Sequence, residues 1–162
     1  MSAEPDPRPK RFRDAMASFP SGVTIVTTAG HDGRWWGFTA TSFCSLSAEP
    51  PLVLVCLAKQ AECHPVFLTA ERFVIHVIPP DHAALAIRFA TRGADKFADA
   101  GFAPNHRGLP VLDSSCVVLE CDSHHRNDGG DHTIHVGRVD ETHHADDHPA
   151  VYFRRDFHQL AR

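Results

Sequence analysis

The chain has 162 residues, of which 43% are hydrophobic and 22% are charged, and its formal net charge is −4. This profile is typical of one globular domain with its own core, and the weak acidic balance argues against binding to nucleic acids or anionic membranes. No apolar run reaches the roughly 20 residues that span a bilayer, and segment 1–15 lacks the apolar core of a secretory signal. We therefore expect a cytoplasmic protein that makes no use of a membrane.

The first third of the chain predicts a helix and a β-hairpin. Residues 1–10 are expected to form a flexible N-terminal tail, and residues 11–162 a single domain. Segment 11–19 repeats apolar residues at helical spacing and predicts a short amphipathic helix that ends at Pro20. The β-branched run 22–29 predicts a strand, which the turn 31–33 joins to a partner strand and its extension over 34–47.

The rest of the chain predicts further strands with short helices between them. The continuous apolar run 52–58 predicts a strand buried on both faces, as in a barrel or at a subunit interface. A polar loop at 59–65 then leads to a short helix near 66–71, a strand at 72–79, a helix over 81–91 and a Gly- and Pro-rich loop over 91–113. Strands follow at 115–126, 132–144 and 150–160. Tight turns between strands favour an antiparallel, mainly β barrel with short peripheral helices.

Cysteine and histidine are the residue types that raise the question of metal or disulfide chemistry. The five cysteines are odd in number and form no C-x-x-C pair, which predicts reduced thiols. Cys44, Cys56 and Cys116 are expected in the core, and Cys63 is the one expected to be exposed. The thirteen histidines lack the spacing of a metal site, so we expect a solvated histidine-rich surface and no metal.

Three segments could form a binding site, although each has a simpler explanation. The hydroxyl-rich run 37–47 could offer a polar groove to a planar ligand, or could be the solvent face of a strand. The loop 59–65 could cradle phosphate, or could be a plain surface connection. In segment 86–97 arginines and a lysine accompany two phenylalanines, which suits a phosphorylated aromatic cofactor and also describes many helix ends. The chain has no G-x-S-x-G, P-loop or G-x-G-x-x-G motif.

Taken in order, several segments resemble the flavin reductase family, whose members have the FMN-binding split-barrel fold. These members are small NAD(P)H:flavin oxidoreductases that serve two-component monooxygenases. The resemblance covers nearly the whole chain from Phe12 to about Phe157. The matching segments are FRDAMASFPSGVTIVTT, GFTATSFCSLSAEPPLVLVCLAK, ERFVIHVI, ALAIRFATRGADKF, GLPVLDSSCVVLEC and GDHTIHVGRV.

The resemblance implies a homodimer, FMN or FAD as flavin, NADH or NADPH as hydride donor, and a separate monooxygenase that receives reduced flavin. It places the flavin ring against the strand that carries T-A-T-S, the ribityl phosphate at the following loop, and three further side chains around the groove. The cofactor-binding residues implied in this way are Thr39, Ala40, Thr41, Ser42, Lys59, Gln60, Ala61, Cys63, Phe89, Lys96 and Phe157.

The family's Gly-Asp-His motif corresponds to Gly130, Asp131 and His132. The resemblance places His132 beside the nicotinamide and the flavin, where it is the expected catalytic residue, and Asp131 would shape the turn and orient the imidazole. A histidine that merely ends a turn is the competing interpretation.

The chain departs from the family's pattern at Ala61, Glu62 and Cys63, where relatives carry hydroxyl side chains that hold phosphate. This change should weaken phosphate binding by about 1–3 kcal/mol. Two other functions stay open: a non-catalytic flavin- or haem-binding protein on the same barrel, and an oxidoreductase that keeps its flavin and acts on an organic substrate.

Overall fold

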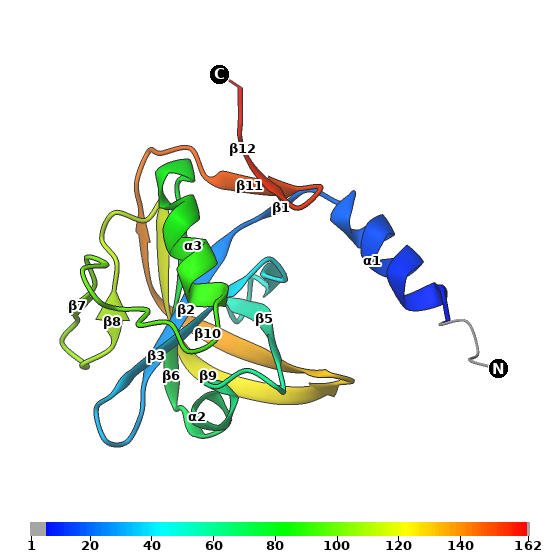
Figure 1. The fold of residues 1–162 in the computed structure, drawn as a ribbon. Helices are drawn as coiled ribbons and strands as arrows, with labels where there is room; N and C mark the ends of the chain where they lie inside the picture. The colour runs from blue at the N-terminus through cyan, green and yellow to red at the C-terminus, as the bar shows by residue number, and fades with distance from the viewer. Residues whose placement is uncertain (1–5, 162) are drawn as a thin grey trace.

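The computed structural model describes residues 6–161, which form one curved seven-stranded sheet, a smaller three-stranded and a smaller two-stranded sheet, and short helices at the periphery (Figure 1). The helices are α1 (Arg8–Ala17), α2 (His64–Thr69) and α3 (Ala83–Ala90), and a 3-10 turn η1 (Pro80–His82) precedes α3. The strands are β1 (Ser21–Gly22), β2 (Thr24–Ala29), β3 (Trp35–Ala40), β4 (Cys44–Ser47), β5 (Leu52–Ala58), β6 (Arg72–Val77), β7 (Ala103–Pro104), β8 (Pro110–Val111), β9 (Val117–Gly129), β10 (His132–His144), β11 (Ala150–Phe153) and β12 (Asp156–Gln159).

The main sheet has the order β3-β2-β6-β9-β10-β5-β4, and every neighbouring pair in it is antiparallel. Its two edge strands, β3 and β4, follow each other in the chain. The sheet curls until Phe38 of β3 packs in the same core cluster as Val55 and Leu57 of β5, although β3 and β5 share no ladder. This is an antiparallel barrel whose edge strands β3 and β4 do not pair, so that β3 faces β5 across the split. It confirms the predicted mainly β class.

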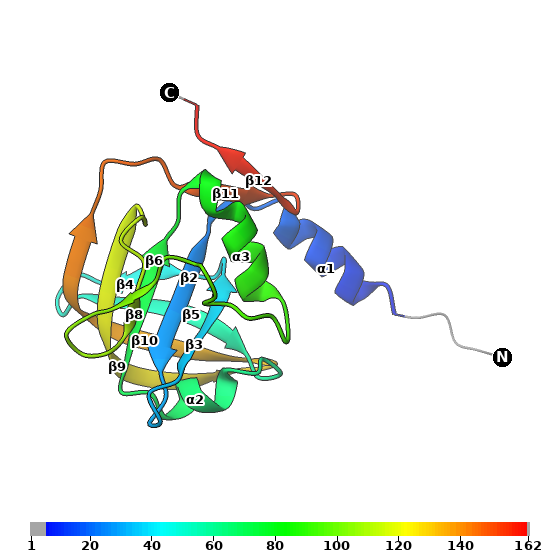
Figure 2. The ribbon, with the colours of Figure 1, turned by 60° about the vertical axis from the view of Figure 1, so that its left-hand side comes forward.

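The barrel core follows from the alternation of side chains along its strands. In β5, Val53, Val55 and Leu57 point inward and are buried, whereas the residues between them are only half-buried. The prediction that this strand is buried on both faces is therefore wrong for the single chain. Its outward face stays only half-buried in the described chain, and Figure 2 shows the curl of the sheet in which β5 lies.

The strands β9 and β10 form a hairpin whose ladder runs along both strands with two register shifts. At the tip, Gly130 has a φ of +78°, which an L side chain rarely adopts, so glycine suits the tight turn. Further along β10, Gly137 lies buried against β9, which carries Cys121, and against the ring of Phe73 in β6. A side chain has no room at this position.

We expect Gly137→Ala to lower the free energy of unfolding by about 1–3 kcal/mol, because overpacking forces neighbouring side chains to move. An added Cβ would lie 2.6 Å from Cζ of Phe73 and 2.8 Å from Cβ of Cys121. Gly22→Ala is the matched control, since a Cβ there meets nothing within 4 Å. Urea unfolding midpoints measure both changes, and equal midpoints for the two variants would contradict the packing described here.

Helix α1 projects away from the barrel in both views (Figures 1 and 2). Its existence was predicted, but it begins at Arg8, within the segment expected to be a tail; residues 1–5 of that segment lie outside the described residues. None of its residues is buried, and Phe12 and Met16 are 65% and 53% exposed. Phe19, just beyond the helix, is 70% exposed. The apolar side of α1 therefore has no partner within the described chain.

Three predictions from the sequence need correction. Segment 150–160 forms two strands, β11 and β12, rather than one, because Arg154 and Arg155 adopt positive φ in a turn between them. Cys63, expected to be exposed, is 1% exposed, since at the start of α2 it packs in the core cluster with Phe38 and Phe67. Cys44 and Cys56 were both expected in the core, but Cys44 is exposed on the edge strand β4 and Cys56 is half-buried on the outward face of β5. Among the described residues, no helix has both the length and the apolar character needed to cross a bilayer.

Two histidines lie in the interior, away from the histidine-rich surface. His76 of β6 is fully buried, its Nδ1 donates to the carbonyl oxygen of Ile25 at 2.9 Å, and its Nε2 has no partner among the described residues. His135 of β10 is 1% exposed and neither ring nitrogen has such a partner. Burial lowers the pKa of each to about 4; for His135, Arg126 and His64 lower it further. Both side chains are neutral at neutral pH.

Candidate functional site

A hollow of about 260 Å³ opens at the split of the barrel, and we call it the His132 pocket. Its walls come from the end of β3, the end of β5 with the loop that follows, α3 with the loop after it, and the start of β10. The lining residues are Phe38, Thr39, Cys56, Leu57, Ala58, Gln60, Ala61, Glu62, Phe89, Ala90, Arg92, Lys96 and His132. Segments that are distant in sequence therefore converge where the barrel fails to close.

The register of β5 with β10 places the predicted catalytic residue in this pocket. His132 pairs with Ala58, and the backbone N–H of Lys59 donates to the carbonyl oxygen of Asp131 at 2.9 Å. The loop after β5 therefore lies directly beside the tip of the β9–β10 hairpin. The Gly130-Asp131-His132 turn and the loop 59–63 were predicted separately, and the strand pairing joins them into one site.

The side chain of His132 is 43% exposed, and its Nδ1 lies 2.7 Å from Oδ1 of Asp131. Because a carboxylate accepts, Nδ1 carries the hydrogen in this contact, and a neutral ring then has Nε2 as its acceptor. The hydrogen bond and the nearby imidazole lower the pKa of Asp131. Asp131 thus fixes both the orientation and the tautomer of His132.

The hydroxyl side chains of the T-A-T-S segment mostly bond to the protein itself. Thr39 lines the His132 pocket, but its Oγ1 donates to the carbonyl oxygen of Ala86 in α3 at 2.6 Å. The hydroxyl of Ser42 accepts from the backbone N–H of Cys56 at 2.9 Å. Ala40 is buried, Thr41 is exposed, and neither they nor Ser42 line the pocket. A ligand here would meet the end of β3 rather than a row of free hydroxyls.

The loop after β5 divides between the pocket and its surroundings. Gln60 and Ala61 line the His132 pocket as predicted. Lys59 lies outside it, and its ammonium group forms an ion pair with Asp128 on the hairpin. Cys63 does not line this pocket either, and burial raises the pKa of its thiol to about 11, so it is protonated and unreactive at neutral pH.

The aromatic and cationic residues predicted around the groove have different positions. Phe89 is buried and forms the floor at α3, while Lys96 donates from Nζ to the carbonyl oxygen of Gly37 at 2.9 Å. Phe157 lies in β12 and packs on Tyr152, with ring centroids 5.2 Å apart, outside the pocket. Within one chain, the side chain of Phe157 therefore does not close the His132 pocket.

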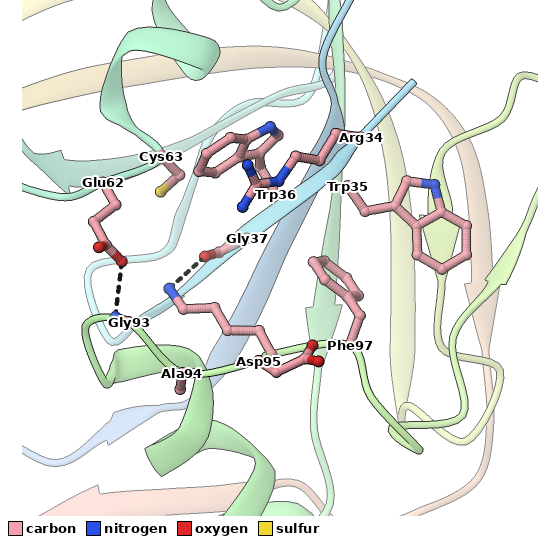
Figure 3. Close-up of a pocket in the computed structure, with 11 residues that line it drawn as sticks. Arg34, Trp35, Trp36, Gly37, Glu62, Cys63, Gly93, Ala94, Asp95 and Phe97 are labelled. Atoms are coloured by element: carbon pink, nitrogen blue, oxygen red, sulfur yellow. Dashed lines mark hydrogen bonds between the residues drawn. The ribbon is translucent and has the colours of Figure 1, made fainter. Parts of the chain in front are cut away.

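A second hollow of about 450 Å³ adjoins the first and shares Glu62 and Lys96 with it (Figure 3). We call it the Trp35 pocket. The guanidinium of Arg34 lies over the ring of Trp36, 4.2 Å from its centroid, and Trp35 meets Phe97 edge-on. The lining residues are Arg34, Trp35, Trp36, Gly37, Glu62, Cys63, Gly93, Ala94, Asp95, Lys96 and Phe97.

The sequence missed several residues of these two pockets. Residues 56–58 have no chemical signal of their own and enter the His132 pocket because β3 and β5 face each other across the split. Phe38 belongs to the run 37–47 that the sequence offered as a possible groove. Arg92 was noticed only as one of several cations near α3. Its position follows from the end of α3 at Ala90, after which the chain turns back toward Glu62.

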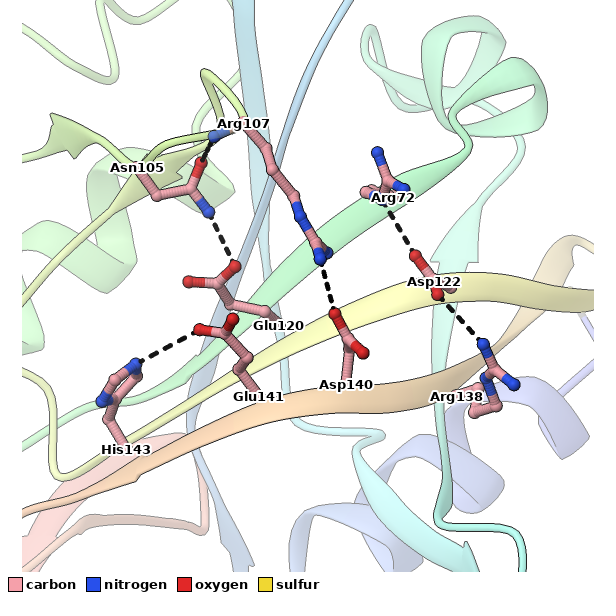
Figure 4. Close-up of polar contacts among 9 residues, drawn as sticks. All are labelled: Arg72, Asn105, Arg107, Glu120, Asp122, Arg138, Asp140, Glu141 and His143. Carbon is pink, nitrogen blue, oxygen red and sulfur yellow. Dashed lines mark hydrogen bonds and ion pairs between the residues drawn. The ribbon is translucent and has the colours of Figure 1, made fainter.

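One cluster on the far part of the β9–β10 hairpin has potential metal ligands (Figure 4). Ligand atoms of Glu120, Glu141 and His143 lie within 4.8 Å of one another. Buried Glu120 already accepts a hydrogen bond from Asn105 at 2.7 Å, and the neighbouring carboxylates pair with arginines, as in Arg107–Asp140 at 2.7 Å. This polar network links the loop before β8 to the hairpin. The expectation that the chain holds no metal stays a prediction.

Comparison with known proteins gives a consistent result. The model of the flavin reductase like domain matches residues 16–161. The chain is 48% identical over 150 residues to the actinorhodin polyketide dimerase of Streptomyces coelicolor, which covers 92% of this chain and 85% of that protein. It is 41% identical over 159 residues to the NADH:riboflavin 5'-phosphate oxidoreductase of Streptomyces pristinaespiralis, covering 96% and 90%.

Two further proteins extend this likeness to structure and to partners. The NADH:FAD oxidoreductase SgcE6 of Streptomyces globisporus C-1027, solved in complex with NAD and FAD fragments, superposes with a TM-score of 0.90 at 31% identity over 99% of this chain and 98% of that chain. HsaB of Mycobacterium tuberculosis, the reductase subunit of a flavin-dependent monooxygenase, is 34% identical over 160 residues, covering 97% and 84%.

Proposed function

The chain belongs to the flavin reductase like domain family, and on this premise we propose how its groove works. The chain is an NAD(P)H:flavin oxidoreductase that reduces FMN or FAD and serves a separate monooxygenase. The observation that supports a site in the His132 pocket is the convergence of Thr39, Gln60, Phe89, Lys96 and His132 at the split of the barrel.

We propose that the isoalloxazine ring lies in the His132 pocket against the end of β3. The donor set fits such a ring, because apolar walls from Phe38 and Phe89 accompany the polar side chains of Gln60 and His132. When bound, the flavin accepts a hydride from a dihydronicotinamide. The protein holds the ring flat on one side and leaves the opposite side open, so a nicotinamide can stack there, and proximity supplies most of the rate.

His132 is proposed as the catalytic residue that contacts the nicotinamide and handles a proton. Its imidazole stands at the rim of the pocket, with Nδ1 held by Asp131 and Nε2 left as an acceptor. An imidazole at this place can orient the nicotinamide carboxamide and exchange a proton with solvent. The remaining cofactor-binding assignments, Ala40, Thr41, Ser42, Lys59, Cys63 and Phe157, stay proposals for backbone contacts or for the assembled protein.

Turnover with free flavin tests the proposed function. We expect purified protein to oxidise NADH or NADPH steadily only when FMN, FAD or riboflavin is added, as followed by absorbance at the nicotinamide band. Dependence on free flavin distinguishes a diffusible product from a tightly held cofactor. No oxidation in any of the pairings would favour a non-catalytic flavin- or haem-binding protein, which the altered loop at Glu62 keeps as the alternative.

We propose that two copies of the chain form a homodimer. The exposed apolar residues Phe12, Met16 and Phe19 on and beside α1, and Leu46 on β4 next to the half-buried outer face of β5, lack cover in the described chain. Exposed apolar surfaces of this kind mark contacts with a partner. Light scattering with size-exclusion chromatography should give twice the chain mass; a monomer mass at micromolar concentration would refute the dimer.

We also propose a domain boundary and a cellular location. Residues 11–162 act as the reductase domain, preceded by the first residues of helix α1. The protein works in the cytoplasm, where nicotinamide donors are available and its cysteines stay reduced. Reduced flavin then reaches the monooxygenase by diffusion from an open groove.

A further inference from the structure

The carboxylate of Glu62 lies at the junction of the two pockets, beside donor groups that could otherwise bind an anion. Its Oε2 accepts from the backbone N–H of Gly93 at 2.9 Å (Figure 3). Its Oε1 lies 3.8 Å from Nε of Arg92. A backbone N–H beside a guanidinium is a combination that binds phosphate well. In this chain the carboxylate of Glu62 supplies the negative charge that a bound phosphate would otherwise supply.

The other cations nearby already contact protein groups, and the guanidinium of Arg34, which lines the Trp35 pocket, lies over the ring of Trp36. Lys59 is paired with Asp128 on the hairpin, and the ammonium of Lys96 donates to the carbonyl oxygen of Gly37. The carboxylates of Asp95 and Asp131 add negative charge at the Trp35 pocket and at the hairpin tip. Arg92 is the cation nearest to Glu62, and Glu62 partly neutralises it.

Glu62 and Lys96 line both pockets, so they mark the passage from one to the other. If the isoalloxazine ring lies in the His132 pocket, a ribityl chain that runs from it toward the Trp35 pocket passes Glu62. The phosphate of FMN would then approach a carboxylate that already accepts from the N–H of Gly93 and is ion-paired with the guanidinium of Arg92, which itself donates to the carbonyl oxygen of Gln60. Repulsion offsets whatever attraction the surrounding cations provide.

We propose that Glu62 serves as a built-in anion in place of the flavin 5′-phosphate, so that the protein recognises its flavin by the ring and reduces riboflavin as readily as FMN. This inference rests on the proposed function, and it makes Glu62 the residue that determines specificity among flavins. Riboflavin and FMN differ only in the phosphate, so the ratio of their kcat/KM values isolates its contribution.

Steady-state kinetics at saturating NADH test the proposal. For the unaltered protein we expect kcat/KM for FMN and for riboflavin to agree within about threefold. Glu62→Ser should raise the FMN-to-riboflavin ratio about tenfold or more, because it frees one backbone N–H and one guanidinium for charge-assisted bonds to phosphate. Dissociation constants from flavin fluorescence quenching should change in the same ratio.

Two controls assign the effect to this anion site. Arg92→Gln introduced together with Glu62→Ser should cancel most of the gain, whereas Glu71→Gln, which removes an exposed charge near α2 and away from the passage, should leave the ratio unchanged. A more than tenfold preference for FMN in the unaltered protein, or an unchanged ratio in Glu62→Ser, overturns the inference. No turnover with either flavin overturns the proposed function instead, and the binding ratio then still tests Glu62.

Discussion

Replacing His132 by alanine is expected to lower kcat about ten- to hundredfold while changing the flavin dissociation constant less than about threefold. The reason is geometric, because His132 stands at the rim of the pocket, whereas the ring would rest on β3, Phe89 and the loop after β5. Steady-state kinetics with NADH and riboflavin give kcat, and fluorescence titration gives the dissociation constant.

Asp131→Asn and His31→Ala complete this experiment. The asparagine keeps a hydrogen-bonding group beside Nδ1 of His132 but removes the charge, so we expect a smaller loss of kcat than for His132→Ala. His31 lies exposed in the β2–β3 turn, and its removal should leave kcat unchanged. If His132→Ala retained full turnover, the histidine would have no part in the reaction.

Acidification is expected to destabilise the fold by several kcal/mol between pH 6.5 and pH 4. The pKa of each buried histidine, His76 and His135, is lowered from 6.5 to about 4. Below pH 6.5 the unfolded chain therefore binds protons that the folded chain refuses, and stability falls until pH reaches about 4. A pKa difference of about 2.5 between the unfolded and the folded chain corresponds to a loss of roughly 3 kcal/mol in the free energy of unfolding for each side chain.

Urea unfolding at several pH values between 7 and 4 measures this loss. Carboxyl groups with a lowered pKa lose most of their stabilising effect as pH falls through and below 3.8, so they add only a small loss at the acid end of this window. These groups are Asp6, Asp14, Asp122, Asp128 and Asp131. His135→Leu should remove roughly half of the pH dependence, because leucine fills the site without a group that titrates. Equal slopes for this variant and the unaltered protein would show that His135 does not carry the effect.

Local patterns predicted most of the strands, because the residue types that mark a strand and its turns lie within a few residues of one another. The β-branched run of β2, the turn 31–33 and the glycine turn before His132 all lie where expected. The second strand at the C-terminus was missed because its turn uses arginines in positive φ rather than glycine. The burial of Cys63 was not predicted because the residue lies in a polar segment, and the sequence did not show that this segment ends at the start of α2.

The candidate site could not be predicted from any one segment, because it depends on strand pairing between segments that are distant in sequence. The alignment of Ala58 with His132 joins two segments more than seventy residues apart, and the split places Phe38 opposite the end of β5. The hydroxyls of Thr39 and Ser42 looked available in the sequence, but tertiary structure gives them partners in α3 and β5. The bond from Gly93 to Glu62 likewise needs the return of the chain after α3.

The central claim is that the His132 pocket holds the isoalloxazine ring with one side open, and a crystal structure of the protein soaked with riboflavin tests it most directly. The account predicts the ring against Thr39 and Phe89, with His132 at the exposed side and the ribityl chain pointing past Glu62. A ring bound elsewhere, or a pocket closed by Lys96 and its neighbours so that no ring enters, would contradict it.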